Sequence, residues 1–154
     1  MNRIVFLDID GPVIPFSSLL LDPYASVNRV IISPIPVAML NKLCQRSGAK
    51  IVFNTTHNTT LDDVPDIDKV LVSAGLRPEY LHADTKTKYP QIPRDVAVRV
   101  WLQQHSEVDD WIAFDDARFT ADDNLIWIDP DAGLHLGHLN QALDRWGCTQ
   151  FIVL

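Results

Sequence analysis

The sequence predicts an α/β fold: a three-layer α/β/α sandwich around a mostly parallel, Rossmann-like sheet. Short apolar runs rich in branched residues alternate with longer segments of helical periodicity, which is the pattern of strands joined by crossover helices. Three of these runs end directly in polar or acidic side chains, as expected where the carboxyl ends of parallel strands line a ligand site. The 154 residues suit a single domain, residues 1–154, with a core of its own.

The predicted strands are short and almost continuously apolar, which is typical of strands buried on both faces of a parallel sheet. The first covers residues 4–7, and Gly11 and Pro12 follow it. Prolines and serines favour an irregular excursion over residues 12–33, with a short strand at 30–32. Further strands are predicted at 50–53, 109–114, 124–129 and 150–154.

Four segments are predicted as helices, with a loop between the second and third. The first begins at Ser33 or Pro34, carries an apolar stripe, and ends at Gly48. The third has Pro93 in its first turn, a position where proline is favoured. The helices are predicted at 33–48, 61–75 (in pieces broken near Pro65), 93–105 and 134–147, and the loop at 81–93.

Composition excludes several classes of protein. The formal net charge of −7 argues against strong non-specific binding to nucleic acid, which requires basic side chains that displace counterions. No apolar run approaches the ~20 residues of a membrane-spanning helix, and the first residues do not form a signal peptide. The two cysteines, Cys44 and Cys148, have no metal-type spacing and are interpreted as reduced thiols. We therefore expect a soluble, cytoplasmic protein without membrane partners.

Polar side chains follow three of the predicted strands at the point where each strand ends. They are Asp8 and Asp10 after the first, Asn54, Thr55 and Thr56 after the second, and Asp115 and Asp116 after the third. Parallel strands would bring these groups to one edge of the sheet. Several carboxylates in one crevice repel each other and resist ionising together. A bound Mg²⁺, which prefers oxygen ligands and keeps waters that a phosphate can replace, removes that difficulty.

Such an arrangement suits phosphoryl transfer. A carboxylate oxygen beside the metal is a plausible nucleophile toward phosphorus, which gives an aspartyl phosphate. A second acid can protonate the leaving group and then activate water. A hydroxyl and a cationic side chain can hold the remaining phosphoryl oxygens.

The motifs resemble those of the haloacid dehalogenase (HAD)-like hydrolases. "FLDIDGPVI" is similar to the first signature of that superfamily, an apolar strand followed by D-x-D-G-x-[VTI]. A strand ending in Thr, a Lys before a helix, and an apolar strand ending in a double Asp ("WIAFDD") follow in the family's order over residues 4–116. The segment "NLIWIDPDAGL" resembles the one that follows the double Asp in small, stand-alone members. The resemblance implies a HAD-like core and a Mg²⁺-dependent phosphatase.

The resemblance also implies roles for individual residues. Asp8 would be the nucleophile and a Mg²⁺ ligand, and Asp10 the general acid/base, with its backbone carbonyl on the metal. Thr55 would hold the phosphoryl group, with Thr56 as the alternative. Asp115 and Asp116 would complete the metal site. The family's dehalogenases typically lack the second acid of the first signature, so the presence of Asp10 favours phosphate chemistry.

The cationic residue of the site is less well defined by the sequence. Lys86 and Lys88 both lie in the predicted loop before the third helix. We prefer Lys88, and Arg94 could reach the same region. His57 follows the second strand and is a candidate contact to substrate. The other histidines, His82, His105, His135 and His138, show no convincing metal-ligand arrangement in the sequence.

Little of the chain is available for a cap domain, so we expect a minimal cap or none. An open site favours either a large substrate that covers it or a partner. The expected substrate is a phosphorylated small molecule or an exposed phosphate end of a macromolecule. Two alternatives stay open: a phosphoryl-accepting signalling module, and a non-catalytic HAD-like protein that binds a partner.

Overall fold

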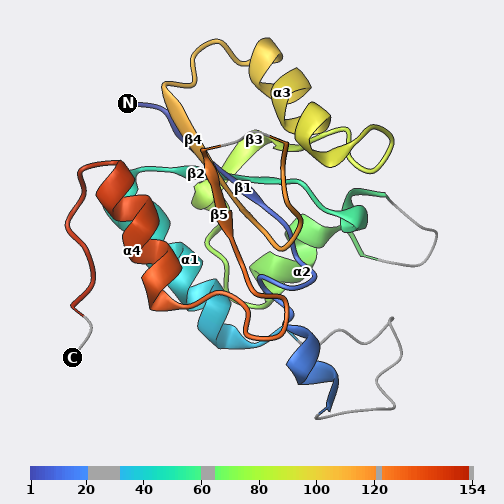
Figure 1. Cartoon of the computed structure of the whole chain (residues 1–154), viewed down its shortest axis with the longest axis vertical. Coiled ribbons are helices and arrows are strands. Elements are labelled where there is room, and N and C mark those ends of the chain that lie inside the picture. Colours follow the sequence, from blue (N-terminus) through green and yellow to red (C-terminus); the bar gives the residue numbers. More distant parts are fainter. Residues whose placement is uncertain (21–31, 60–64, 121–122, 153–154) are drawn as a thin grey trace.

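The computed structural model describes residues 1–20, 32–59, 65–120 and 123–152. Five parallel strands form one sheet in the order β3-β2-β1-β4-β5 (Figure 1). Their bounds are Arg3–Leu7 for β1, Lys50–Phe53 for β2, Leu81–Lys86 for β3, Asp110–Asp115 for β4 and Leu125–Trp127 for β5. This architecture confirms the predicted α/β class with a parallel, Rossmann-like sheet.

The topology places a switch point at the centre of the sheet. From β1 the chain builds outward through β2 and β3, and then crosses to the other side of β1 to add β4 and β5. Strands β1 and β4 pair in register from Arg3↔Asp110 to Leu7↔Phe114. In open parallel sheets, ligands bind beyond the carboxyl ends of the strands at such a point. Here that point is the end of β1 and β4, where the sequence continues into acidic residues.

Four α-helices lie in the described part of the chain: α1 Pro34–Ser47, α2 Ile67–Ser73, α3 Arg94–Gln104 and α4 Leu136–Arg145. Short 3₁₀ turns occur at Phe16–Leu20, Thr56–Asn58 and Pro78–Tyr80. Helices α1 and α4 lie together against one face of the sheet, and α3 lies against the other (Figure 1). Within the described residues, no helix has the length and apolar content needed to cross a membrane.

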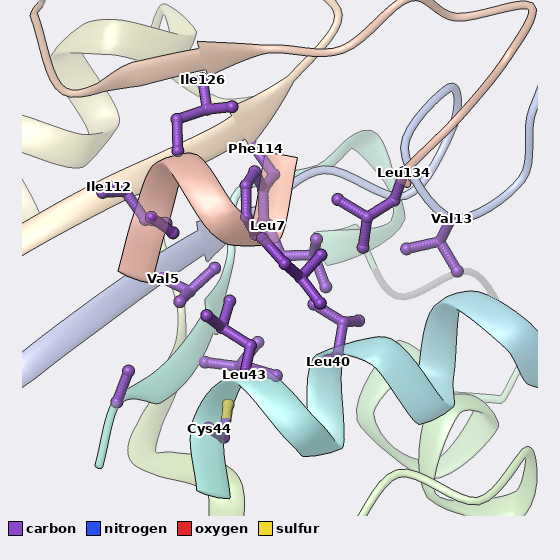
Figure 2. Close-up of a cluster of buried hydrophobic side chains, with 14 of the residues drawn as sticks. Val5, Leu7, Val13, Leu40, Leu43, Cys44, Ile112, Phe114, Ile126 and Leu134 are labelled. Carbon is purple, nitrogen blue, oxygen red and sulfur yellow. The ribbon is translucent and has the colours of Figure 1, made fainter. Parts of the chain in front are cut away.

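Helix α1 begins and ends as the sequence predicts. The Ser33 hydroxyl accepts a hydrogen bond from the Ile35 N–H at 3.4 Å, and proline stands in the first turn. Gly48 follows the last helical residue in the left-handed conformation and donates its N–H to the Cys44 carbonyl. The stripe Val37, Leu40 and Leu43 is fully buried, and Figure 2 shows Leu40 and Leu43 directed toward the sheet.

The alternation of side chains along each strand sorts them onto two faces. Val5 and Leu7 of β1, with Ile112 and Phe114 of β4, belong to the core beneath α1 and α4 (Figure 2). The intervening residues, Ile4, Phe6, Val52 and Ala113, belong to a second cluster beneath α3. Continuing each alternation by one step places Asp8, Asn54 and Asp115 on the α3 face, at the carboxyl edge of the sheet.

Two segments differ from the sequence-based expectation. Residues 81–86, predicted as loop, form the edge strand β3, which pairs with β2. The stretch LHADTK lacks the apolar run of a buried strand because an edge strand is half exposed and only its backbone needs the pairing.

The strand predicted at 150–154 is absent over the described residues 150–152. There Phe151 is held instead by the Asn140 side chain and by the Arg46 guanidinium, 3.7 Å from its ring. The strand predicted at 30–32 lies almost wholly outside the described residues.

Candidate active site

Three carboxylates gather at the carboxyl edge of the central strands. Asp8, Asp115 and Asp116 each offer one oxygen, and these oxygens all lie within 4.8 Å of one another. Asp8 and Asp115 are buried, at 3% and 1% exposure, and Asp116 is half-buried. The structure thus brings Asp8, which follows β1, next to the two acids at the end of β4, although they are far apart in the sequence.

Gly11 allows the loop after β1 to pack against this cluster. Its φ of +92° lies in the region that side-chain-bearing residues avoid, and a Cβ at this position would lie 3.1 Å from Asp116 Cβ. Around it the loop folds back on itself, since the Gly11 N–H donates to the Ile14 carbonyl and the Val13 N–H to the Ile9 carbonyl. The glycine of "DIDG" is therefore required by the approach of this loop to the double Asp.

A single guanidinium joins two of the acids. Arg94 Nη1 lies 2.6 Å from Asp8 Oδ2 and 2.7 Å from Asp115 Oδ1. Arg94 Nη2 donates to the Tyr89 hydroxyl at 3.0 Å, and the guanidinium carbon lies 4.5 Å from the centroid of the Tyr89 ring. Because Arg94 is the first residue of α3, its backbone lies at the end of the helix that faces the carboxyl edge of the sheet. A phosphoryl group on Asp8 would therefore lie within reach of this cation.

Burial makes the ionised forms of Asp8 and Asp115 unfavourable, and this favours the binding of a cation. Burial raises the pKa of Asp8, and this outweighs the lowering effects of Arg94, the Ile9 N–H and the Thr55 hydroxyl. Burial, followed by the charge of Asp8, raises the pKa of Asp115 to about 7. Both ionised carboxylates are costly in this environment, and one guanidinium does not fully compensate them. A second cation among these oxygens would relieve the repulsion.

The donor set of the cluster fits a hard divalent cation. It consists of carboxylate oxygens only, with one half-buried member that leaves access for water and substrate. Mg²⁺ prefers such oxygen ligands and retains several waters, whereas softer metals favour nitrogen or sulfur donors. Asp8, Asp115 and Asp116 are thus the side chains that would hold Mg²⁺. The Asp10 side chain is not part of this group, and the role of its backbone carbonyl on the metal stays a prediction.

Thr55 and Thr56 occupy different environments. Thr55 is fully buried, its hydroxyl is hydrogen-bonded to Asp8, and it also accepts from the His57 N–H at 3.4 Å. Thr56 is exposed, in the 3₁₀ turn that follows. Of the two, only Thr55 lies against Asp8, the residue expected to be the nucleophile.

Asp10 turns away from the cluster toward His57. His57 Nε2 lies 3.1 Å from Asp10 Oδ2, and both side chains are partly exposed. The hydrogen bond that His57 donates to Asp10 raises the pKa of His57, burial lowers it, and the charges of Asp10 and Asp8 raise it further. An acid that is accessible to solvent and oriented by an imidazole is suited to exchange protons with a leaving group and with water.

The structure does not bring either predicted lysine to the acids. Lys86 is the last residue of β3 and pairs with Asp66, with Nζ 3.1 Å from Oδ1. Lys88 is exposed and has no ion pair or hydrogen bond from its side chain within the described ranges. Arg94, named in the sequence analysis only as a possible contact, is the cation at the site. The physical reason is that residues 81–86 form the edge strand β3, so β2 lies between Lys86 and the strand β1 that carries Asp8, whereas Arg94 is the first residue of α3.

The sequence predicted Asn54 at this edge of the sheet without a role for it, and it gave no role to Tyr89. Asn54 Oδ1 accepts from the Thr87 hydroxyl at 2.7 Å, and Asn54 Nδ2 donates to the Arg94 carbonyl at 3.3 Å, so Asn54 joins β2, the residue after β3 and the start of α3. Asn54 follows Val52 on the α3 face, and this alternation was the available signal. Tyr89 had none, because it lies in an irregular segment.

The geometry agrees with a comparison against protein families. The family described as "HAD domain in Swiss Army Knife RNA repair proteins" matches residues 4–139, which include every member of the acidic cluster and Arg94. The chain belongs to this family. HAD domains are generally hydrolases and typically use Mg²⁺, and this HAD domain contains a cluster of three acidic side chains that could hold a metal ion. No curated protein and no solved structure matches the chain.

Proposed function

We propose that this HAD domain is a Mg²⁺-dependent phosphatase that works through an aspartyl phosphate on Asp8. The observation that carries the proposal is the triangle formed by Asp8, Asp115 and Arg94: a buried carboxylate lies beside a second buried acid and in direct contact with a guanidinium. A structural salt bridge would need only one acid for each cation. Here the single guanidinium of Arg94 pairs with two buried acids, and the carboxylate of Asp116 lies next to them.

The residues divide the reaction between them. An oxygen of Asp8 forms a bond to phosphorus while the bond from phosphorus to the leaving oxygen breaks, and Asp10 donates its proton to that oxygen. In the second step Asp10 takes a proton from water, the water oxygen attacks phosphorus, and the bond to Asp8 breaks to release inorganic phosphate. Arg94 and the Thr55 hydroxyl bind the phosphoryl oxygens on which charge must be stabilised. Mg²⁺ bound by the acidic cluster would supply charge neutralisation between carboxylates and phosphate.

The preferred substrate is a phosphorylated end of RNA. The description of the family supports this choice, and so does the scarcity of chain available for a cap. The net charge of −7 disfavours binding along a nucleic-acid backbone but not recognition of a terminal phosphate by a site that holds a divalent cation. Such a reaction would take place in the cytoplasm.

The direct test is hydrolysis by the purified full chain with Mg²⁺ and, separately, with EDTA. The panel contains an aryl phosphate, nucleoside monophosphates, a sugar phosphate, and oligoribonucleotides phosphorylated at the 3′ or the 5′ end. We expect Mg²⁺-dependent multiple turnover, with higher kcat/KM for one class of oligoribonucleotide end than for the small molecules. A single stoichiometric phosphorylation without turnover would indicate the signalling alternative, and Mg²⁺ binding without any reaction would indicate a non-catalytic protein.

An exposed aromatic ring beside the acids provides a sharper test of the RNA substrate. Trp127 ends β5, pairs in register with Asp115, and is 38% exposed. Its indole N–H donates to the Asp116 carbonyl at 2.7 Å, and the Arg118 guanidinium carbon lies 4.9 Å from its ring. A ring anchored at the edge of a phosphate site, with a cation beside it, is suited to stack on the terminal base.

Trp127→Ala should therefore raise the KM for phosphorylated oligoribonucleotides by roughly tenfold, because stacking of one base on an aromatic ring contributes about 1–3 kcal/mol. Trp127→Phe, which keeps an aromatic face but loses the N–H, should restore most of the affinity. The measurement is steady-state kinetics on an oligoribonucleotide and on glycerol phosphate, which has no base to stack. An equal rise of both KM values would mean that Trp127 acts only on the shape of the acidic cluster.

A further inference from the structure

A second group of metal-ligating side chains lies at the opposite end of α3 from Arg94. His82 is in β3, His105 follows the last residue of α3, and Glu107 lies in the connection to β4. One ring nitrogen from each histidine and one carboxylate oxygen of Glu107 lie within 4.8 Å of one another. Since α3 has 11 residues, about 16 Å of helix separates this group from the acidic cluster.

The two imidazole rings are held in place by Trp101. The ring of His105 stacks on the buried indole, with centroids 3.6 Å apart and an interplanar angle of 11°. The ring of His82 meets the same indole edge-on at 5.0 Å, and its centroid lies 5.2 Å from that of His105. Both rings are thus partly buried and oriented before any ligand arrives, which reduces the entropy that binding would cost.

A backbone carbonyl at Nδ1 of His105 leaves Nε2 of that ring for a ligand, whereas His82 Nδ1 has both a backbone N–H and a carbonyl beside it, so its Nε2 is free in only one of the two tautomers. His105 Nδ1 lies 2.7 Å from the Trp101 carbonyl, which can only accept, so Nδ1 carries a proton, and in the neutral imidazole Nε2 then has the lone pair. His82 Nδ1 lies 3.2 Å from the Asp84 carbonyl and 3.0 Å from the Asp84 N–H. Metal-binding histidines almost always donate their second N–H to such a carbonyl or to a carboxylate. A metal on His82 Nε2 would select the tautomer that donates to the Asp84 carbonyl.

We propose that His82, His105 and Glu107 form a binding site for Zn²⁺ or a similar borderline transition-metal ion, which ties the edge strand β3 to the connection between α3 and β4. Two imidazoles and one carboxylate are ligands typical of zinc, whereas the all-oxygen cluster at Asp8 suits Mg²⁺. Ligand atoms about 2.0–2.2 Å from Zn²⁺ lie closer together than 4.8 Å, and the exposed side chain of Glu107 has the freedom to close that difference.

Asp84 and a water are the candidates for the fourth position. Asp84 Oδ2 lies 3.5 Å from His105 Nε2, a separation typical of two ligands on one tetrahedral ion. Its carboxylate is not required to define the site, since the three proposed ligands meet without it. The site does not depend on the proposed phosphatase activity, because none of its members contacts the acidic cluster.

The test is a titration of the EDTA-treated full chain with Zn²⁺ in millimolar Mg²⁺, which occupies the oxygen-only cluster. We expect one Zn²⁺ per chain with micromolar or tighter affinity by calorimetry, and a rise in the thermal unfolding temperature. Co²⁺ in place of Zn²⁺ should give the intense visible absorption of tetrahedral coordination. In spectra of nitrogen-15-labelled protein, His82 should become protonated at Nδ1 when Zn²⁺ binds.

Three variants separate this site from incidental binding. His82→Gln should weaken Zn²⁺ binding by roughly tenfold or more, because one ligand is lost. Glu107→Gln changes only an exposed carboxylate, so it should fold normally and also weaken binding. His135→Gln removes an exposed imidazole outside the group and should bind Zn²⁺ as the original chain does. The proposal is overturned if micromolar Zn²⁺ does not bind in the presence of Mg²⁺, or if His82→Gln and Glu107→Gln both titrate like the original chain.

Discussion

Asp8→Asn should abolish phosphatase turnover and leave the fold intact. The amide has nearly the same shape as the carboxylate but no anionic oxygen to attack phosphorus, so kcat should fall by about 10⁴-fold or more. The side-chain oxygen of the introduced asparagine can still accept from the Ile9 N–H, and Asp115 still pairs with Arg94. Because burial raises the pKa of Asp8, the ionised carboxylate is costly there, and a neutral amide should leave the unfolding temperature unchanged or slightly higher.

The measurement combines kinetics with trapping of a phosphate mimic. The unaltered chain with Mg²⁺ should bind beryllium fluoride, which mimics a phosphoryl group on a carboxylate, and Asp8→Asn should not. Asp144→Asn, which changes an exposed acid on α4, is the matched control and should retain full activity. Substantial turnover by a correctly folded Asp8→Asn protein would contradict the aspartyl-phosphate mechanism.

Arg94→Met should reduce both activity and stability. The substitution keeps an unbranched side chain but removes the cation that contacts Asp8 and Asp115 at 2.6 and 2.7 Å. Loss of one donor to the phosphoryl oxygens should lower kcat/KM by about 10²–10³-fold. Loss of the partner of two buried acids should destabilise the fold by about 3–5 kcal/mol near neutral pH, because an uncompensated buried charge is strongly unfavourable.

The loss of stability in Arg94→Met should depend on pH in a defined direction. The pKa of Asp115 is already raised to about 7 in the folded chain, and removing the guanidinium removes a group that lowers it. Between the ordinary value of 3.8 and the raised value, the folded state binds more protons than the unfolded state, so stability falls as the pH rises. The difference in unfolding temperature between the variant and the original chain should therefore be larger at pH 8 than at pH 5, and Mg²⁺ should reduce it.

Two further substitutions decide which cation serves the site. Arg94→Lys keeps the charge and should restore part of the activity, but the ammonium lacks the second nitrogen with which Arg94 donates to the Tyr89 hydroxyl. Lys88→Met changes an exposed side chain and should have little effect on activity or stability. If Lys88→Met instead lost activity while Arg94→Met retained it, the sequence-based preference for Lys88 would be correct and the role assigned here to Arg94 would be wrong.

Much of the fold followed from patterns that are local in the sequence. The short, almost continuous apolar run of β1 and the helical stripe of α1 are both signals that are local in the sequence, so their positions were predictable. The convergence of Asp8 with Asp115 was also predictable, because parallel strands must end at the same edge of a sheet. The edge strand β3 was not, since its residues, LHADTK, form a strand through backbone pairing with β2 rather than through a pattern of their own.

By itself, the sequence determined the family, the parallel sheet and the acids at its carboxyl edge, because these depend on periodicity and on motifs of adjacent residues. Only the tertiary structure decided which cation meets those acids. The sequence offers three candidate cations in the same region, Lys86, Lys88 and Arg94, and their charges alone do not distinguish them. In the folded chain, Arg94 at the start of α3 is the one of the three that contacts both Asp8 and Asp115. The same applies to His82, His105 and Glu107, whose ligand atoms meet only because β3 and the end of α3 both pack on Trp101. Contacts between segments that are distant in sequence depend on how the elements pack, and no local pattern encodes that packing.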